Sequence, residues 1–151
     1  MGITQCRPGM MPRSVQTNGA MNMYGFSMQI RTGLDEAIDR VTAALKTEGF
    51  GILSDIDVAA TLRTKLGVET RPYRILGACN PPLAHRALSA DLDVGLLLPC
   101  NLVVREEADG TIRVAFMDPV AVLALAEHPE VAALAVEVKV RLERVRDALA
   151  S

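Results

Sequence analysis

The last part of the chain predicts one long amphipathic helix, and this helix limits the fold more than any other segment. From Pro129 onward, apolar residues recur every three or four positions and form one stripe: Val131, Leu134, Val138, Leu142, Val145 and Leu149. Arginines lie on the other faces near the helix end, where positive charge suits the helix dipole. Such a stripe must be buried against another layer, so we expect this helix to pack across a sheet.

The composition indicates one soluble domain with an aliphatic core. The chain has 151 residues, half of them hydrophobic, but only 3% are aromatic. A length of this order corresponds to a single domain with a sizeable core. The formal net charge is −2, whereas nucleic-acid binders carry clusters of positive charge. No apolar run approaches the length of a membrane span. We therefore expect neither a nucleic-acid nor a membrane partner.

The first 21 residues differ in composition from the rest of the chain. Residues 1–21 are polar, rich in Gly, Pro and Met, and without periodicity, which predicts a flexible extension or a true start at Met21 or Met23. Residues 22–151 are expected to form a single α+β domain. The extension contains Cys6 but no hydrophobic run of the kind a secretory signal needs. Together with an odd count of three cysteines, this predicts reduced thiols in the cytoplasm.

The rest of the chain predicts an α+β fold rather than a doubly wound one. A first helix follows the capping pattern of Thr32 and Asp35 and ends at Gly49. Short helical pieces are expected after three capping residues, Asp57, Asn80 and Asp118. Strands are expected over residues 24–30, 50–56, 71–78, 94–104 (bent at Pro99) and 111–117. A homodimer would cover the exposed edges of such an aliphatic sheet.

The dipeptide Cys-Asn occurs twice, each time after an apolar run, and marks the candidate site. Its residues are Cys79, Asn80, Cys100 and Asn101, to which we add Gly77, whose missing side chain permits close approach of a ligand or marks a bulge. Cys79 precedes a helix start, which favours a thiolate. The plainer alternative is that both cysteines fill core space. The asparagines have plainer roles as well, in capping a helix and satisfying backbone groups at the Pro99 bend.

Whether the two cysteines meet depends on topology. If the strands that carry them are antiparallel neighbours, Cys100 lies about seven residues beyond the point opposite Cys79, or roughly 23 Å away. If residues 80–93 form a crossover between parallel strands, both Cys-Asn pairs end neighbouring strands and converge. Matching apolar runs that end in the same dipeptide favour convergence.

Established catalytic and metal-binding motifs are absent from the sequence. There is no Cys-x-x-Cys, nucleophile elbow, phosphate loop or dinucleotide fingerprint. His85 and His128 have no recognised ligand spacing, and Cys79 and His85 are expected to face apart. A soft metal would need ligands beyond the two thiols, for example from a second chain. No particular cofactor is indicated.

Three blocks of the sequence resemble a family of proteins of unknown function. The blocks GFGILSDIDV, YRILGACNP and GLLLPCN cover residues 49–58, 73–81 and 95–101. In their order and spacing they resemble domain-of-unknown-function family 302 (DUF302), over roughly residues 24–149. The resemblance implies a TATA-binding-protein-like fold of β-α-β4-α order, in which the first and last helices pack on a single curved, mostly antiparallel sheet with two short helical inserts. The family has no agreed activity, and a likeness of fold does not carry function.

These observations leave three expectations for function. The first is a binding or sensing module, with a pocket near the two Cys-Asn motifs for a small molecule or a soft metal ion. The second is a thiol-dependent enzyme of sulfur or peroxide chemistry, with Cys79 as nucleophile. The third is a structural or interaction protein whose cysteines are buried. No residue is assigned a catalytic role.

Overall fold

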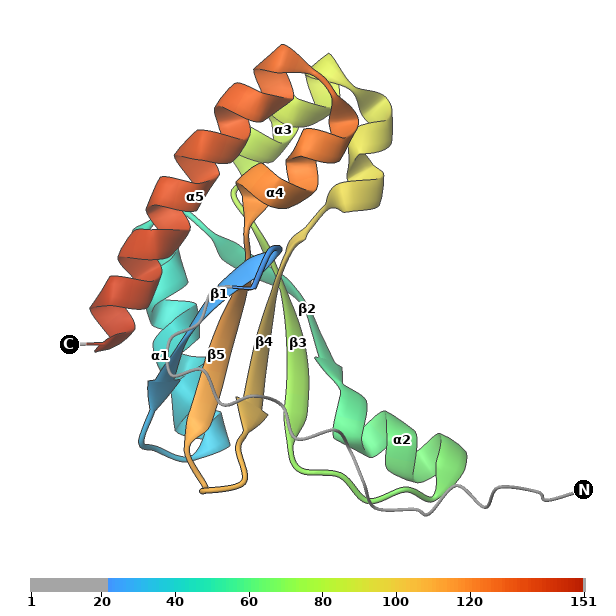
Figure 1. The fold of residues 1–151 in the computed structure, drawn as a ribbon, viewed down its shortest axis with the longest axis vertical. Coiled ribbons are helices and arrows are strands. Elements are labelled where there is room, and N and C mark those ends of the chain that lie inside the picture. The colour runs from blue at the N-terminus through green and yellow to red at the C-terminus, as the bar shows by residue number, and fades with distance from the viewer. Residues whose placement is uncertain (1–21, 151) are drawn as a thin grey trace, which may run out of the picture.

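A computed structural model describes residues 22–150 (Figure 1), so the extension expected over residues 1–21 lies outside the described residues. The strands are β1 (Gly25–Ile30), β2 (Gly51–Asp57), β3 (Tyr73–Cys79), β4 (Cys100–Glu106) and β5 (Ile112–Met117). The α-helices are α1 (Leu34–Thr47), α2 (Val58–Leu66), α3 (Pro81–Ala90), α4 (Pro119–Leu123) and α5 (Pro129–Ala150). Two 3-10 helices complete the elements, η1 (Leu92–Leu97) and η2 (Ala124–Ala126).

The strands form one five-stranded antiparallel sheet in the order β1-β5-β4-β3-β2. Strands β2 to β5 are neighbours in the order in which they follow one another in the chain, and β1 joins the far side of β5. The predicted α+β class and the order of the main elements, one strand, one helix, four strands and a long helix, are confirmed. Within residues 22–150, no helix has the length and apolar character needed to cross a bilayer.

Helices α1 and α5 pack against each other and against the sheet, and the main core lies between these layers. Alternate residues of the strands face this core, because side chains along a strand alternate between the two sides of a sheet. They include Phe26, Leu76, Leu102, Val104, Ile112, Val114 and Phe116. The rings of Phe26 and Phe116 stack with centroids 5.2 Å apart. The core is therefore aliphatic apart from a few phenylalanines, as the composition predicts.

The apolar stripe of α5 is buried along its whole length, which confirms the predicted burial of this face. Its second half lies near α1 and β1: Arg40 donates a hydrogen bond to the Leu149 carbonyl, and the Arg146 guanidinium lies 5.3 Å from the centre of the Phe26 ring. The first half continues beyond the end of the sheet, where it contacts α3 and α4 (Figure 1). One helix therefore covers two regions of the molecule.

Two local predictions are wrong. Residues 94–98 do not form a buried strand, because η1 occupies this segment and β4 begins only at Cys100. The Asp91 carboxylate accepts a hydrogen bond from the backbone of Asp93 and starts the 3-10 turn. The apolar run does not alternate as a strand would: Val94 is buried, Leu96 is 87% exposed, and residues 97–98 are partly buried. Thr32 does not cap α1, since its hydroxyl donates to Glu36 and the capping position is Gly33.

Candidate functional site

The two Cys-Asn motifs meet at one end of the sheet, where β3 stops and β4 starts. Strand β3 pairs with β4 in antiparallel register, with Ala78 opposite Cys100, so Cys79 lies one residue diagonally from Cys100. The parallel crossover expected from the sequence is therefore wrong. The cysteines are neighbours for a different reason: η1 uses up residues 92–97, so Cys100 stands at the beginning of its strand rather than seven residues along it.

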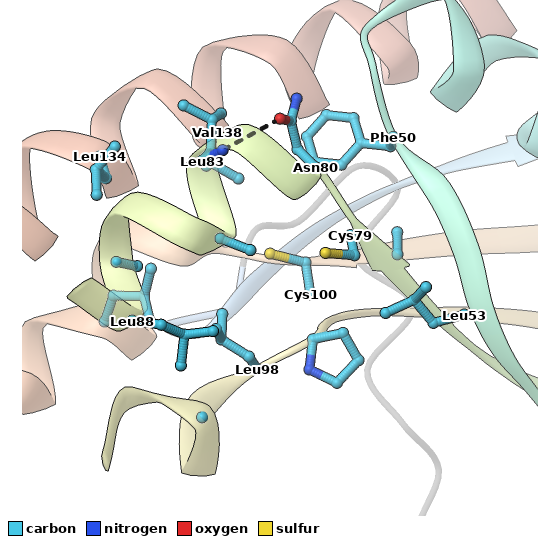
Figure 2. A pocket seen from close by; sticks show the side chains of 16 residues that line it. Phe50, Leu53, Cys79, Asn80, Leu83, Leu88, Leu98, Cys100, Leu134 and Val138 are labelled. Carbon is cyan, nitrogen blue, oxygen red and sulfur yellow. Dashed lines mark hydrogen bonds between the residues drawn. The ribbon is translucent and has the colours of Figure 1, made fainter. Parts of the chain in front are cut away.

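Both cysteines line a pocket of about 270 Å³, which we call the thiol pocket (Figure 2). It lies between the end of the sheet, α3, η1, α4 and the first half of α5. Its lining residues are Phe50, Leu53, Ala78, Cys79, Asn80, Leu83, Ala84, Ala87, Leu88, Gly95, Leu98, Pro99, Cys100, Leu123, Leu134 and Val138. Apart from the two thiols and Asn80, every lining side chain is apolar.

The space in the thiol pocket follows from small residues on its walls. Helix α3 turns Ala84 and Ala87 toward the pocket, β3 contributes Ala78, and η1 contributes Gly95. Larger residues at these positions would fill the gap between α3 and the sheet, as they do elsewhere in the core. The opposite wall is made by Leu53, which lies at an irregularity of β2 between Ile52 and Ser54. That leucine is 68% exposed, so the pocket is open on this side.

Burial controls the chemistry of both thiols. Cys100 is buried and Cys79 is partly exposed, and both are free cysteines. Burial raises the pKa of the Cys100 thiol to about 11, and the nearby Cys79 adds to this effect. Burial also raises the pKa of Cys79. The thiolate that the sequence predicted at the start of α3 is therefore disfavoured, because loss of hydration outweighs the helix terminus at this position.

The Asn80 side chain makes hydrogen bonds that connect the elements around the pocket. Its side-chain oxygen caps α3 by accepting from the backbone N–H of Leu83, at 3.4 Å (Figure 2). Its side-chain nitrogen donates to the Glu48 carbonyl, at 3.3 Å, which also accepts from Arg141 of α5, at 3.0 Å. The predicted capping role is confirmed, and the amide additionally ties α3 to the end of α1.

The remaining two candidate residues do not line the pocket. Asn101 follows Cys100 in β4, so its side chain lies on the other side of the sheet, where it is exposed. Gly77 is needed for packing: a Cβ atom there would lie 2.4 Å from the Ser54 hydroxyl and 2.8 Å from the Pro99 ring. The predicted close approach at Gly77 is real, but the approaching groups belong to the protein itself.

Other groups that would extend the chemistry are not near the thiols. His85 lies on the exposed side of α3, whereas Cys79 lines the pocket. The two residues therefore do not form a Cys-His pair. Among residues 22–150, no three His, Cys, Asp or Glu side chains are grouped so that they could hold a metal ion. What the site offers is therefore an apolar pocket with two neutral thiols.

Sequence reasoning missed most of the pocket walls. Leu134 and Val138 belong to the predicted stripe of α5, but the sequence assigned that stripe only to packing on a sheet. The small residues Ala84 and Ala87 carried a usable signal, since they fall on the same face of α3 as the buried Leu83. Leu53 carried none, because its position depends on the irregularity in β2.

These features define a class: a small α+β protein with an antiparallel sheet and an apolar pocket that holds two thiols. A family model described as "Domain of unknown function DUF302" matches residues 26–149. The chain therefore belongs to the DUF302 family. Its fold is similar to the crystal structure of an uncharacterized conserved DUF302 protein from Bacillus stearothermophilus, with a TM-score of 0.78 and 34% sequence identity, over 85% of this chain and 99% of the other. No curated protein matches the chain.

Proposed function

We propose that the protein is a binding module that takes a small, mainly apolar molecule into the thiol pocket. The observation that carries this proposal is a pocket of about 270 Å³ at the end of the sheet with almost wholly apolar walls. Its volume lies just below the range of about 300–1,000 Å³ that is common for ligand sites, and an apolar cavity of about 150 Å³ can hold benzene. The expected ligand is therefore about the size of a substituted benzene ring.

The same surroundings favour binding over thiol catalysis. A catalytic cysteine has to be a thiolate near neutral pH, and positive groups or a hydrogen-bonded base usually provide this. Here burial raises the pKa of both Cys79 and Cys100, and no histidine faces them. Free thiols in a binding site remain reduced in the cytoplasm, the location expected from the sequence.

Calorimetric titration of the full chain with n-butylbenzene tests the proposal. We expect saturable binding of one molecule per chain. Ala87→Leu places a larger side chain in the pocket and should weaken binding at least tenfold. The matched control is Ala133→Leu, the same substitution on the exposed side of α5, which should leave binding unchanged. No saturable binding by the unmodified protein, or equal binding by Ala87→Leu, would favour the structural alternative instead.

A further inference from the structure

The thiol pocket combines two features, a pair of cysteines and an apolar chamber beside them. Ala78 lies directly opposite Cys100, and Cys79 is the next residue of β3, so strand alternation alone would direct the two cysteine side chains to different sides of the sheet. They border one space because the pocket lies at the end of the sheet and is lined from both strands. Both side chains line the same space, and in Figure 2 both sulfurs lie on the side of the sheet end that faces α3. A group bound in this space therefore borders both thiols.

Charge and ligand count limit what that group can be. Structural zinc needs four ligands, and residues 22–150 contain no group of three His, Cys, Asp or Glu side chains that could hold a metal ion. Monovalent copper held by two thiolates would leave a net negative charge in a pocket whose lining contains no Lys, Arg or His. Burying an unpaired charge of this kind is strongly unfavourable. An uncharged adduct that uses both sulfurs fits the lining better.

The geometry points to a chelating dithiol: Cys79 and Cys100 together bind a trivalent, thiophilic centre that carries an apolar substituent, such as a monosubstituted organoarsenical, with the substituent seated in the thiol pocket. This inference rests on the proposed function and names the chemistry of its ligand. For an organic arsenic(III) oxide, each sulfur forms a bond to arsenic and each thiol proton goes to the oxide oxygen. The oxygen leaves as water, arsenic remains trivalent, and no electrons are transferred.

The neutral thiols of the pocket suit this exchange. Two protons move from sulfur to oxygen within the reaction, so its equilibrium needs no thiolate and its product is uncharged. Burial, which raises the pKa of Cys79 and of Cys100, disfavours metal ions that must displace thiol protons into water. Soft sulfur ligands prefer soft centres, which agrees with arsenic(III) as the bound atom. The apolar walls then select arsenicals with an organic group over inorganic arsenite.

Phenylarsine oxide is the probe that tests this inference. The reduced full chain is used with Cys6→Ser, which removes the third thiol and leaves Cys79 and Cys100. Intact-mass spectrometry should show one phenylarsenic group per chain, with the mass of one water lost. The adduct should survive excess 2-mercaptoethanol and be released by 2,3-dimercaptopropanol. Inorganic arsenite should be retained at least tenfold less well.

Single-cysteine variants decide whether both sulfurs take part. Cys79→Ser and Cys100→Ala, each combined with Cys6→Ser, should lose at least 100-fold in retention against 2-mercaptoethanol. Circular dichroism shows whether each variant is folded, and Cys100→Val is a second apolar replacement if Cys100→Ala is not. Retention by either folded variant as strong as in the parent would overturn the dithiol. So would failure of the parent to bind phenylarsine oxide.

The n-butylbenzene titration separates this inference from the proposed function. If n-butylbenzene binds but phenylarsine oxide is not retained, the pocket stands and the dithiol is wrong. If phenylarsine oxide is retained equally by the parent and by Ala87→Leu, its phenyl group does not occupy the pocket, and the claim about the substituent is overturned. For this comparison both probes are applied to the Cys6→Ser protein, with and without Ala87→Leu.

Discussion

Helix α5 covers two regions of the molecule that are packed differently. Its second half, with α1 and the sheet, closes the main core, in which Leu45, Phe116 and Leu142 are at most 2% exposed. Its first half covers the thiol pocket, where about 270 Å³ remains unfilled. The apolar stripe of α5 is the same kind of surface in both halves, with Leu134 and Val138 in one and Leu142 in the other.

The difference therefore comes from what lies opposite α5. In the closed core, large side chains of the strands meet those of α1 and α5. At the pocket, α3 offers Ala84 and Ala87, and the strand ends offer Ala78 and the two cysteines. Protein interiors are normally close-packed, and an unfilled apolar space costs stability. A space kept open by small residues from several elements is what a binding site requires.

Truncating a leucine in each region should show the difference in packing most clearly, as unequal losses in the free energy of unfolding. Leu142→Ala removes a fully buried side chain of the closed core and should cost about 3–5 kcal/mol in the free energy of unfolding. Leu88→Ala removes a partly buried side chain that already borders open space, and should cost less than about 2 kcal/mol. The chain has no tryptophan, so urea unfolding is followed by circular dichroism. Equal losses would mean that the two regions are packed alike.

The closed core was largely predictable from the sequence, whereas the pocket was not. Periodicity identifies α5 and the strand of Phe26, because each of these patterns reports the burial of a single face. The apolar run at residues 94–98 misled, since a run without alternation fits a buried strand as well as a 3-10 turn with exposed leucines. Because the 3-10 turn was not predicted, the sequence did not show why Cys79 and Cys100 become neighbours.

The candidate site shows the same limit at the level of single residues. Asn80 was correctly placed as a cap, because capping depends on the residues just after it. Asn101 looked equivalent in sequence but lies on the opposite side of the sheet from Cys100, since a strand alternates its side chains. Environment decided the chemistry of Cys79, whose pKa is raised by the layers packed around it. Local sequence contains no information about those layers.

Alkaline pH should lower the free energy of unfolding because of the Cys100 thiol. Burial raises its pKa to about 11, whereas a thiol in the unfolded chain has a pKa of about 8.5. Between these values the unfolded state has lost a proton that the folded state keeps. The contribution of this thiol to stability is therefore complete below about pH 8.5 and is lost as the pH rises toward 11.

The size of this effect is measured against Cys100→Ala, which lacks the titrating group. The difference in free energy of unfolding between the two proteins should shift by about 2–3 kcal/mol, to the disadvantage of the unmodified protein, between pH 8 and pH 10.5. Urea unfolding at the two pH values measures it, and groups common to both proteins cancel. A difference that is independent of pH would show that Cys100 is not held in an apolar environment.

Enlarging an alanine in each region should give a smaller difference in the free energy of unfolding, and it tests directly whether the pocket is empty. Ala37 of α1 is fully buried in the closed core, so Ala37→Leu should overpack it and cost about 1–3 kcal/mol. Ala87 of α3 is also buried but borders the pocket, so Ala87→Leu can extend into empty apolar space, and the free energy of unfolding should change by less than about 1 kcal/mol. The exposed Ala133→Leu should change it by no more than about 0.5 kcal/mol. If Ala87→Leu costs as much as Ala37→Leu, the walls of the pocket close on each other in solution and leave no room for a ligand.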